Sequence, residues 1–272
     1  KETNLPPAST RLNIKSCLVL PGLIDSHVHL RDQQLAYRED FTTGTAAAAA
    51  GGVTTVIDMP NNRPITMSSE ALRERMQLAE KRILVNVAFN SAFPQRTEEI
   101  RAIVGEGAVG FKLYLLQQIG GVNIDDNNAL QGALSAVAET KVPIAVHAED
   151  KATLEDAEKS MRDAGRNDAK AFVEAHPASA EVKAIQRVSK LRKNSGAHMH
   201  ICHVSSAVGL GTVLKAKKMG LNITCEVTPH HLLLTSQFLE EHGNMALMLP
   251  PLRTKADVEA LWKALKLSLI HI

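Results

Sequence analysis

The chain of 272 residues is poor in cysteine: it has three, and no two of them form a CxxC pair. This spacing argues against a disulfide framework, so we expect reduced thiols in a cytoplasmic protein. Long apolar runs are also missing, and none reaches the length of a bilayer span. The sequence has no basic block and its net charge is only +2, so we expect neither a nucleic acid nor a membrane as a partner. The N-terminal residues lack the pattern of a signal peptide.

What the sequence does contain is an alternation of short apolar runs, rich in β-branched residues, with longer helical patterns. This alternation predicts a parallel sheet covered by helices. We expect an α/β fold of the (β/α)₈ TIM-barrel type, whose usual length is roughly 250 residues. An open doubly wound sheet is the alternative. No glycine-rich GxGxxG turn follows the first strand, which argues against a dinucleotide-binding version of that sheet.

Local patterns add detail to this barrel. An alanine-rich helix is predicted to end at Gly51 and Gly52, and Thr254 with Asp257 forms the capping-box pattern of a helix start. Residues 151–175 are charged and helical without a clear core face, which predicts a solvated helical insertion over the top of the barrel. Residues 117–125 predict a glycine-bearing loop after a strand, either an ordinary connection or a lid over an active site.

Two histidines, His27 and His29, stand two residues apart at the end of the first apolar run. Side chains at positions i and i+2 of a strand point the same way, so the two histidines share a face. They lie at the carboxyl end of the strand, where barrel enzymes place their catalytic groups. Taken alone, the pair is weak evidence, because any two histidines in a strand give the same pattern.

Other strand ends supply groups of the same chemical kind, namely His147, His203 and Lys112. Imidazole suits zinc, so histidines from three strand ends together predict a metal centre at one rim of the barrel. A lysine that burial and nearby cations keep neutral can react with carbon dioxide. The resulting carbamate has two oxygens and can bridge two metal ions. A salt-bridged or surface lysine is the alternative.

A second pair, His198 and His200, is assigned a structural role. In that strand Met199, Ile201 and His203 are expected to share the face that packs into the barrel interior, with His203 at its top. The alternate residues, including both histidines of the pair and the following Cys202, would then face the helix layer.

These motifs resemble the cyclic amidohydrolases. "VLPGLIDSHVHLRD" is similar to the first-strand motif of that superfamily, and "EDFTTGTAAAAAGGVTTVIDMPNNRPIT" to its continuation. "FKLYL", "AVHAED", "HICHVSS", "CEVTPHHLLLT" and "LPPLRT" then follow in family order, so the similarity runs from about Val19 to Thr254. "HVHLRD" with "DMPNN" most resembles dihydroorotase. Allantoinases and hydantoinases share the HxH and the lysine but usually lack the combination of Arg31 and Asn61.

The resemblance implies a binuclear zinc site on a distorted barrel. His27 and His29 would hold one zinc ion, His147 and His203 the other, and a carboxylated Lys112 would bridge the two. Such a site makes hydroxide at neutral pH for attack on the ring amide of dihydroorotate. In the biosynthetic direction, N-carbamoyl-L-aspartate closes to the ring as water leaves, a step of pyrimidine biosynthesis.

The resemblance also implies how a substrate is held. Arg31 would grip the substrate carboxylate through its planar fork, and Asn61 would share that task. The alternatives are a rim salt bridge for Arg31 and a turn position for Asn61. Accessory residues are assigned structural roles in preference to roles at the site: His230 and His231, which match a family motif, and Cys202 and Glu226, which could be additional ligands.

The sequence departs from the family pattern in three ways. Gln33 and Gln34 stand where the family often has Pro-Gly, and Leu249 stands where many relatives carry a polar substrate contact. Most importantly, the catalytic aspartate that the family carries on its eighth strand is absent, and "LSLIHI" occupies the place where that strand should begin. We therefore expect an incomplete barrel over residues 19–272, with an exposed edge beside the first strand, and a remnant of an N-terminal β segment in residues 1–18.

The leading interpretation is thus a dihydroorotase that acts on a small molecule and forms a homodimer. Aspartate transcarbamoylase is named as a candidate partner. A related cyclic ureide hydrolase, such as an allantoinase or hydantoinase, is the alternative within the same class. A non-catalytic dihydroorotase-like scaffold is the alternative from a different class. The presence of all five metal ligands that precede the missing aspartate argues against the scaffold.

Overall fold

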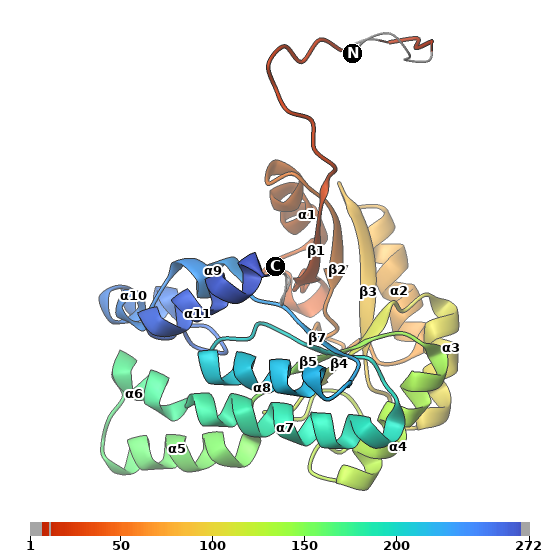
Figure 1. Ribbon diagram of the computed structural model, residues 1–272. Coiled ribbons are helices and arrows are strands. Elements are labelled where there is room, and N and C mark those ends of the chain that lie inside the picture. The colour runs from red at the N-terminus through yellow and green to blue at the C-terminus, as the bar shows by residue number, and fades with distance from the viewer. Residues whose placement is uncertain (1–6, 11, 268–272) are drawn as a thin grey trace.

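The computed structural model describes residues 7–10 and 12–267 (Figure 1). Seven parallel strands form one sheet in sequential order: β1 (Leu23–Val28), β2 (Val53–Asp58), β3 (Asn86–Ala92), β4 (Gly110–Tyr114), β5 (Ile144–His147), β6 (Met199–Ile201) and β7 (Ile223–Cys225). The helices that alternate with them are α1 (Phe41–Ala50), α2 (Ser69–Glu80), α3 (Ile100–Glu106), α4 (Asn127–Thr140), α5 (Lys151–Asp163), α6 (Ala169–Ala175), α7 (Ala178–Ser195), α8 (Ala207–Lys218), α9 (Pro229–Leu233), α10 (Ser236–His242) and α11 (Lys255–Lys266). None of these described helices is long and apolar enough to cross a membrane.

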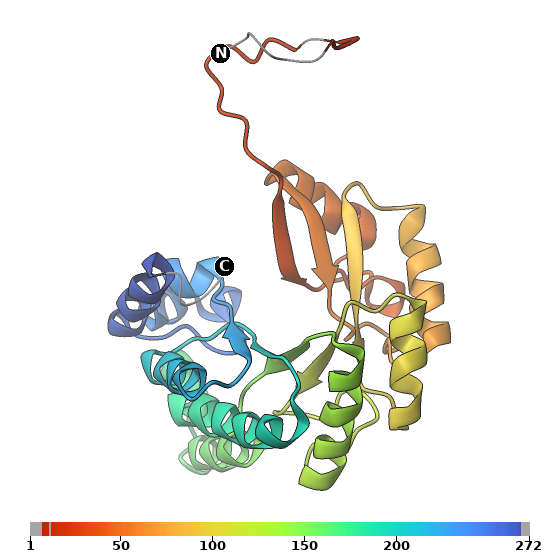
Figure 2. The same cartoon turned by 45° about the vertical axis from the view of Figure 1, so that its right-hand side comes forward.

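The sheet curls into a barrel that is open between its two edge strands (Figure 2). Within the described part of the chain, β1 pairs only with β2 and β7 pairs only with β6. The predicted parallel α/β barrel is therefore confirmed, and over the described residues it is open. The residues expected to begin that strand, 267–272, lie almost wholly outside the described residues. The exposed edge beside β1 is also present, since Leu23 and Ile24 are 60% and 65% exposed.

The segment before β1, residues 12–22, forms neither a helix nor a strand and is exposed along its length. The interpretation of residues 1–18 as a remnant of a β segment stays a prediction.

Two helix boundaries follow the predicted capping signals. Helix α1 ends with Gly51 as its C-cap, whose N–H reaches the last carbonyls of the helix. Helix α11 begins with the capping box, in which the Thr254 hydroxyl accepts from the Asp257 N–H and the Asp257 carboxylate accepts from the Thr254 N–H. Each cap satisfies backbone groups that have no partner inside the helix.

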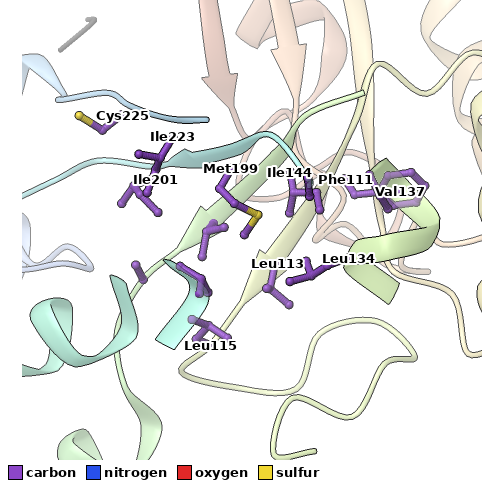
Figure 3. Close-up of a cluster of buried hydrophobic side chains, with 14 of the residues drawn as sticks. Phe111, Leu113, Leu115, Leu134, Val137, Ile144, Met199, Ile201, Ile223 and Cys225 are labelled. Carbon is purple, nitrogen blue, oxygen red and sulfur yellow. The ribbon is translucent and has the colours of Figure 1, made fainter. Parts of the chain in front are cut away.

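The strands have two faces of different chemistry. The outer face is apolar and packs on the helix layer, so that Phe111, Leu113 and Met199 lie in one buried cluster with Leu134 and Val137 of α4 (Figure 3). The inner face lines the lumen of the open barrel and carries the residues between them in sequence: Lys112, Ala145, His147, His200, Thr224 and Glu226. The main hydrophobic core therefore lies between sheet and helices, as in other helix-covered parallel sheets.

The expected orientation of β6 is wrong. Met199 and Ile201 face the helix layer, whereas His200 and the following Cys202 face the lumen, where Cys202 contacts Lys112. The sequence analysis placed Met199 and Ile201 in the barrel interior because apolar side chains suit a packed interior. In this structure the packed apolar interior lies between the sheet and the helices. His203 leaves the strand pattern, since β6 ends at Ile201 and the φ angle of His203 is 36°.

Residues 151–175 form α5 and α6, as expected for a helical insertion, but they have a core face. Leu154 of α5 is buried, and Phe172 and Val173 of α6 pack on a small cluster of Leu239, Ala246 and Leu252. The sequence showed no clear apolar stripe because the two helices are short and each buries only a few side chains.

Candidate metal and substrate site

The five predicted metal ligands lie together at the carboxyl ends of the strands. His27 is in β1, Lys112 in β4 and His147 at the end of β5, while His29 directly follows β1 and His203 lies two residues after β6. The His27 ring centroid lies 5.3 Å from the centroids of both His29 and His203, and the His147 and His203 centroids are 4.5 Å apart. The structure thus brings together side chains that are up to 176 residues apart in the chain, from His27 to His203.

Lys112 lies among these imidazoles and is almost completely buried, with 1% of its surface exposed. Its Nζ is 3.4 Å from His27 Nε2 and 2.9 Å from Cys202 Sγ. No carboxylate of the described residues pairs with it. A buried amine without an anionic partner is costly, which suits a group that is used chemically and does not suit a structural salt bridge.

Hydrogen bonds to carboxylates orient two of the imidazoles. His27 Nδ1 is bonded to the Glu226 carboxylate, and His147 Nε2 lies 2.7 Å from Glu149 Oε2. A carboxylate can only accept, so these two nitrogens carry the protons and donate them. The other nitrogens, His27 Nε2 and His147 Nδ1, are left with lone pairs for a metal, an arrangement common in metal sites.

The remaining imidazoles also fit a metal. His29 Nδ1 lies 2.7 Å from Asn61 Oδ1 and donates to it, which leaves Nε2 free. His203 Nδ1 is buried and has no hydrogen-bond partner among the described residues. Buried polar atoms are nearly always paired, so this orphan nitrogen indicates that something outside the described chain completes the site.

Burial keeps these imidazoles neutral. Desolvation, with the adjacent Lys112 as the next contribution, lowers the pKa of His27 to about 4. Desolvation likewise brings the pKa values of His29 and His203 well below the usual value and lowers that of His147. Neutral imidazole is the form that binds metal ions, so at neutral pH the site needs no proton release from these residues.

Two residues for which a structural role was preferred belong to the site. Donor atoms of His27, Cys202 and Glu226 all lie within 4.8 Å of one another, close enough for one metal ion to contact all three. Glu226 also accepts from His200 Nε2 at 3.1 Å and from the His203 N–H at 3.2 Å. It therefore ties β6 and β7 to β1 at the floor of the site.

Three histidines outside the predicted set, His198, His200 and His231, have hydrogen-bond partners of their own. His198 and His200 both bond to the Thr224 hydroxyl, at 3.0 and 2.8 Å. His231 is buried between the Thr228 hydroxyl and the Pro250 carbonyl. The expectation of structural roles for these residues agrees with these contacts.

A cavity of about 1120 Å³ opens above the imidazoles. Arg31 lines it, and its Nη1 donates to the Asn61 carbonyl at 3.1 Å. Asn61 also lines it, although its side chain is engaged with His29. Leu249 and residues 117–119 of the glycine-bearing loop complete one side, so that loop does border the site. Whether it acts as a lid stays a prediction.

Glu149 is the functional residue that sequence reasoning missed. It is completely buried, and burial by itself raises its pKa, but the hydrogen bond from His147 together with the charges of His147, His176 and Arg253 lowers that pKa overall. Its spacing was a usable signal, because a carboxylate two residues after a strand-end histidine stands beside that histidine.

Comparison with known proteins places these observations in a family. Residues 16–208 match the sequence pattern of the family described as dihydro-orotase-like. A dihydroorotase from Methanosphaera stadtmanae is 34% identical over 258 residues, covering 93% of this chain and 58% of that protein. An allantoinase from Solibacter usitatus is 32% identical and covers 95% of this chain and 57% of the relative.

A solved structure agrees with this placement. The L-hydantoinase (dihydropyrimidinase) from Arthrobacter aurescens superposes with a TM-score of 0.87 at 31% identity, over 92% of this chain and 56% of that one. The chain thus spans somewhat more than half the length of the relatives it matches. The chain belongs to the dihydroorotase-like family of the amidohydrolase superfamily.

Proposed function

We propose that the protein is a dihydroorotase that interconverts N-carbamoyl-L-aspartate and dihydroorotate, with two zinc ions bridged by carboxylated Lys112. The observation that carries the choice of substrate is the charge of the cavity. Arg31, Arg38 and Arg63 line it, and no acidic side chain among the described residues does. Such a cavity favours an anionic ring over a neutral one. Dihydroorotate carries a carboxylate, whereas hydantoin and allantoin are neutral rings.

The chain's own residues would hold the metals as the hydrogen bonds indicate. His27 and His29 would bind metal through Nε2 and His147 through Nδ1, because the other nitrogen of each ring is hydrogen-bonded. A carbamate on Lys112 would convert a buried amine that has no carboxylate partner among the described residues into an anion that could lie between two cations. When bound, the metals supply an activated water at neutral pH and polarise a carbonyl.

Substrate contacts would come from the cavity wall. Arg31 has one guanidinium nitrogen on the Asn61 carbonyl and no other side-chain bond within the described residues, so most of its fork is available to a carboxylate. The Tyr114 hydroxyl lines the cavity, is buried and has no partner in the described part of the chain. Burial raises its pKa, so the hydroxyl stays protonated and can donate to a ring carbonyl.

The alternative function is that of an allantoinase or hydantoinase. It is supported by the similarity to the Solibacter usitatus allantoinase and by the superposition with the Arthrobacter aurescens L-hydantoinase. Both functions use the same metal centre, so the metal ligands do not discriminate between them. The arginine-lined cavity is what supports the anionic substrate over the neutral ones.

The test is an assay of the whole protein, loaded with zinc and bicarbonate, on dihydroorotate, allantoin and hydantoin. We expect turnover of dihydroorotate, a rise in KM and a lower kcat in Arg31→Ala, and two zinc ions per chain by elemental analysis. Preference for allantoin or hydantoin would replace the proposed substrate and retain the reaction. A zinc-free protein without turnover would instead support the non-catalytic scaffold.

A further inference from the structure

The segment that carries Arg31 has an unusual backbone. Arg31, Asp32 and Gln33 have φ angles of 50°, 53° and 50°, the left-handed region that residues with a Cβ rarely enter. Three such residues in succession are unfavourable unless surrounding contacts fix them. The relevant question is therefore which contacts hold this segment, because they also decide where the Arg31 guanidinium points.

One buried ion pair fixes both ends of the segment. Arg75 of α2 donates from Nε and Nη2 to Asp58 Oδ2, at 2.9 and 2.5 Å, while its Nη1 donates to the Arg31 carbonyl at 3.0 Å and to Gln33 Oε1 at 3.1 Å. The second oxygen of Asp58 accepts from the Leu30 N–H at 2.8 Å. Arg75 and Asp58 are each 1% exposed.

The geometry makes this pair a rigid bridge. The guanidinium of Arg75 lies 4.7 Å from the centroid of the Phe41 ring, which fixes its plane. A planar fork with two bonds to one carboxylate has little freedom left, so its third nitrogen is aimed at the segment. Asp32 is held separately, since its carboxylate accepts from Arg82 and from the Phe41 N–H.

The consequence concerns the cavity. The carbonyl that Arg75 binds belongs to Arg31 itself, so the bridge sets the backbone from which the Arg31 side chain enters the cavity. We propose that Arg75 and Asp58 are positioning residues that aim the Arg31 guanidinium and thereby set the preference for a carboxylate-bearing substrate. This inference rests on the proposed function, in which Arg31 binds that carboxylate.

The variant Arg75→Lys tests it, because lysine keeps the charge but cannot bond Asp58 twice and Arg31 at the same time. We expect KM for dihydroorotate to rise roughly ten-fold to a hundred-fold, as misplaced binding groups cause elsewhere, with a smaller change in kcat and unchanged zinc content. The matched control is Arg73→Lys on the same helix, where Arg73 grips Glu106 through Nε and Nη2 at the surface. The control should leave KM unchanged.

A double variant separates positioning from general damage. If Arg75 acts through Arg31, then Arg75→Lys adds nothing to the KM of Arg31→Lys, because coupled residues are not additive. Multiplied effects would overturn the proposal. Should Arg75→Lys not fold, Gln33→Met removes one anchor of the bridge without touching the ion pair, and it should raise KM in the same direction.

Hydrogen exchange distinguishes failure of this proposal from failure of the proposed function. The Leu30 N–H is bonded to Asp58, and the Asp32 N–H to the Glu39 carbonyl at 2.9 Å. Faster exchange of these amides in Arg75→Lys, but not in Arg73→Lys, supports the bridge whatever the substrate. Unchanged exchange overturns it. Absence of dihydroorotate turnover in the unmodified protein refutes only the proposed function, and exchange alone then decides the positioning role.

Discussion

The outer and inner faces of the same strands carry side chains of different kinds. In β4, Phe111 and Leu113 pack outward against helices, while Lys112 between them points into the lumen. In β6, Met199 and Ile201 pack outward, while His200 points inward. Because successive side chains of a strand point to opposite faces, residues that pack the core and residues that line the candidate site are neighbours in the sequence.

The difference shows where polarity is tolerated. Around Phe111, Leu113, Met199 and Ile201 the outer face packs against helices through apolar contacts, so an unpaired polar group there would be expensive. The inner face carries a lysine, several imidazoles and two carboxylates, Glu149 and Glu226, most of which bond to one another. Substitutions on the inner face should accordingly change activity and metal content, whereas substitutions on the outer face should change stability.

The largest expected effect is on the inner face. Lys112→Ala should reduce turnover to background and lower the zinc content, because it removes the group that is proposed to bridge the metal ions. The free energy of unfolding of the metal-free protein should change by less than about 1 kcal/mol, since the variant removes a buried amine that has no carboxylate partner in the described chain. Elemental analysis and urea unfolding measure the two quantities.

Lys159→Ala provides the control for the Lys112 variant, because Lys159 lies at the surface and pairs only with Asp163 four residues on. It should leave activity and zinc content unchanged. Full turnover and zinc content in Lys112→Ala would refute the role of the lysine in the metal site.

The opposite signature is expected on the outer face. Phe111 is fully buried, and its ring centroid lies 5.3 Å from that of Phe93. Phe111→Ala should lower the free energy of unfolding by about 3–5 kcal/mol, as large-to-small core changes do. The zinc content and kcat of the folded fraction should not change.

Val109→Ala, just before the same strand, is the control for Phe111→Ala, since Val109 is 39% exposed and should tolerate the change. Loss of zinc from Phe111→Ala at unaltered stability would break the comparison of the two faces.

Of the inner-face residues, the sequence predicts only those near the carboxyl ends of the strands as site residues. His27, His29, Lys112, His147 and His203 were found because each follows or lies within an apolar run, and carboxyl ends of parallel strands meet at one rim. The face predicted for β6 is wrong because the apolar and the polar residues of this strand both lie in buried surroundings. Only the packing of the helices on the sheet shows that the apolar interior lies between sheet and helices and not in the barrel lumen.

Two further features depend on contacts between distant parts of the chain. The left-handed turn of His203 has no signal in its own residue type, since φ angles above zero favour glycine or asparagine. The bridge of Arg75 to Asp58 and Arg31 joins residues 17 and 44 positions apart. An arginine on a predicted helix reads as a surface residue, and only the packing of α2 on the sheet buries it.

The smallest expected effect tests whether burial alone explains the low pKa values of the inner-face imidazoles. His231 lies away from both strand faces, on α9, and burial lowers its pKa to about 4. The folded protein therefore resists protonation of His231 while the unfolded chain accepts a proton near pH 6.5. Stability from this group is present above that value and is lost as pH falls toward 4.

Between pH 7 and pH 6 the linkage relation gives a loss of about 0.7 kcal/mol from His231. Urea unfolding of the metal-free protein and of its His231→Asn variant at both pH values measures the part of this loss that comes from His231. Asparagine does not titrate, and the other histidines contribute equally to both proteins. The difference in stability loss between the two should have that size, with the unmodified protein losing more. An equal loss in both would mean that His231 is solvated enough to titrate normally. Burial would then be an insufficient explanation for the neutral imidazoles on the inner face, and the geometry around Lys112 would have to account for them.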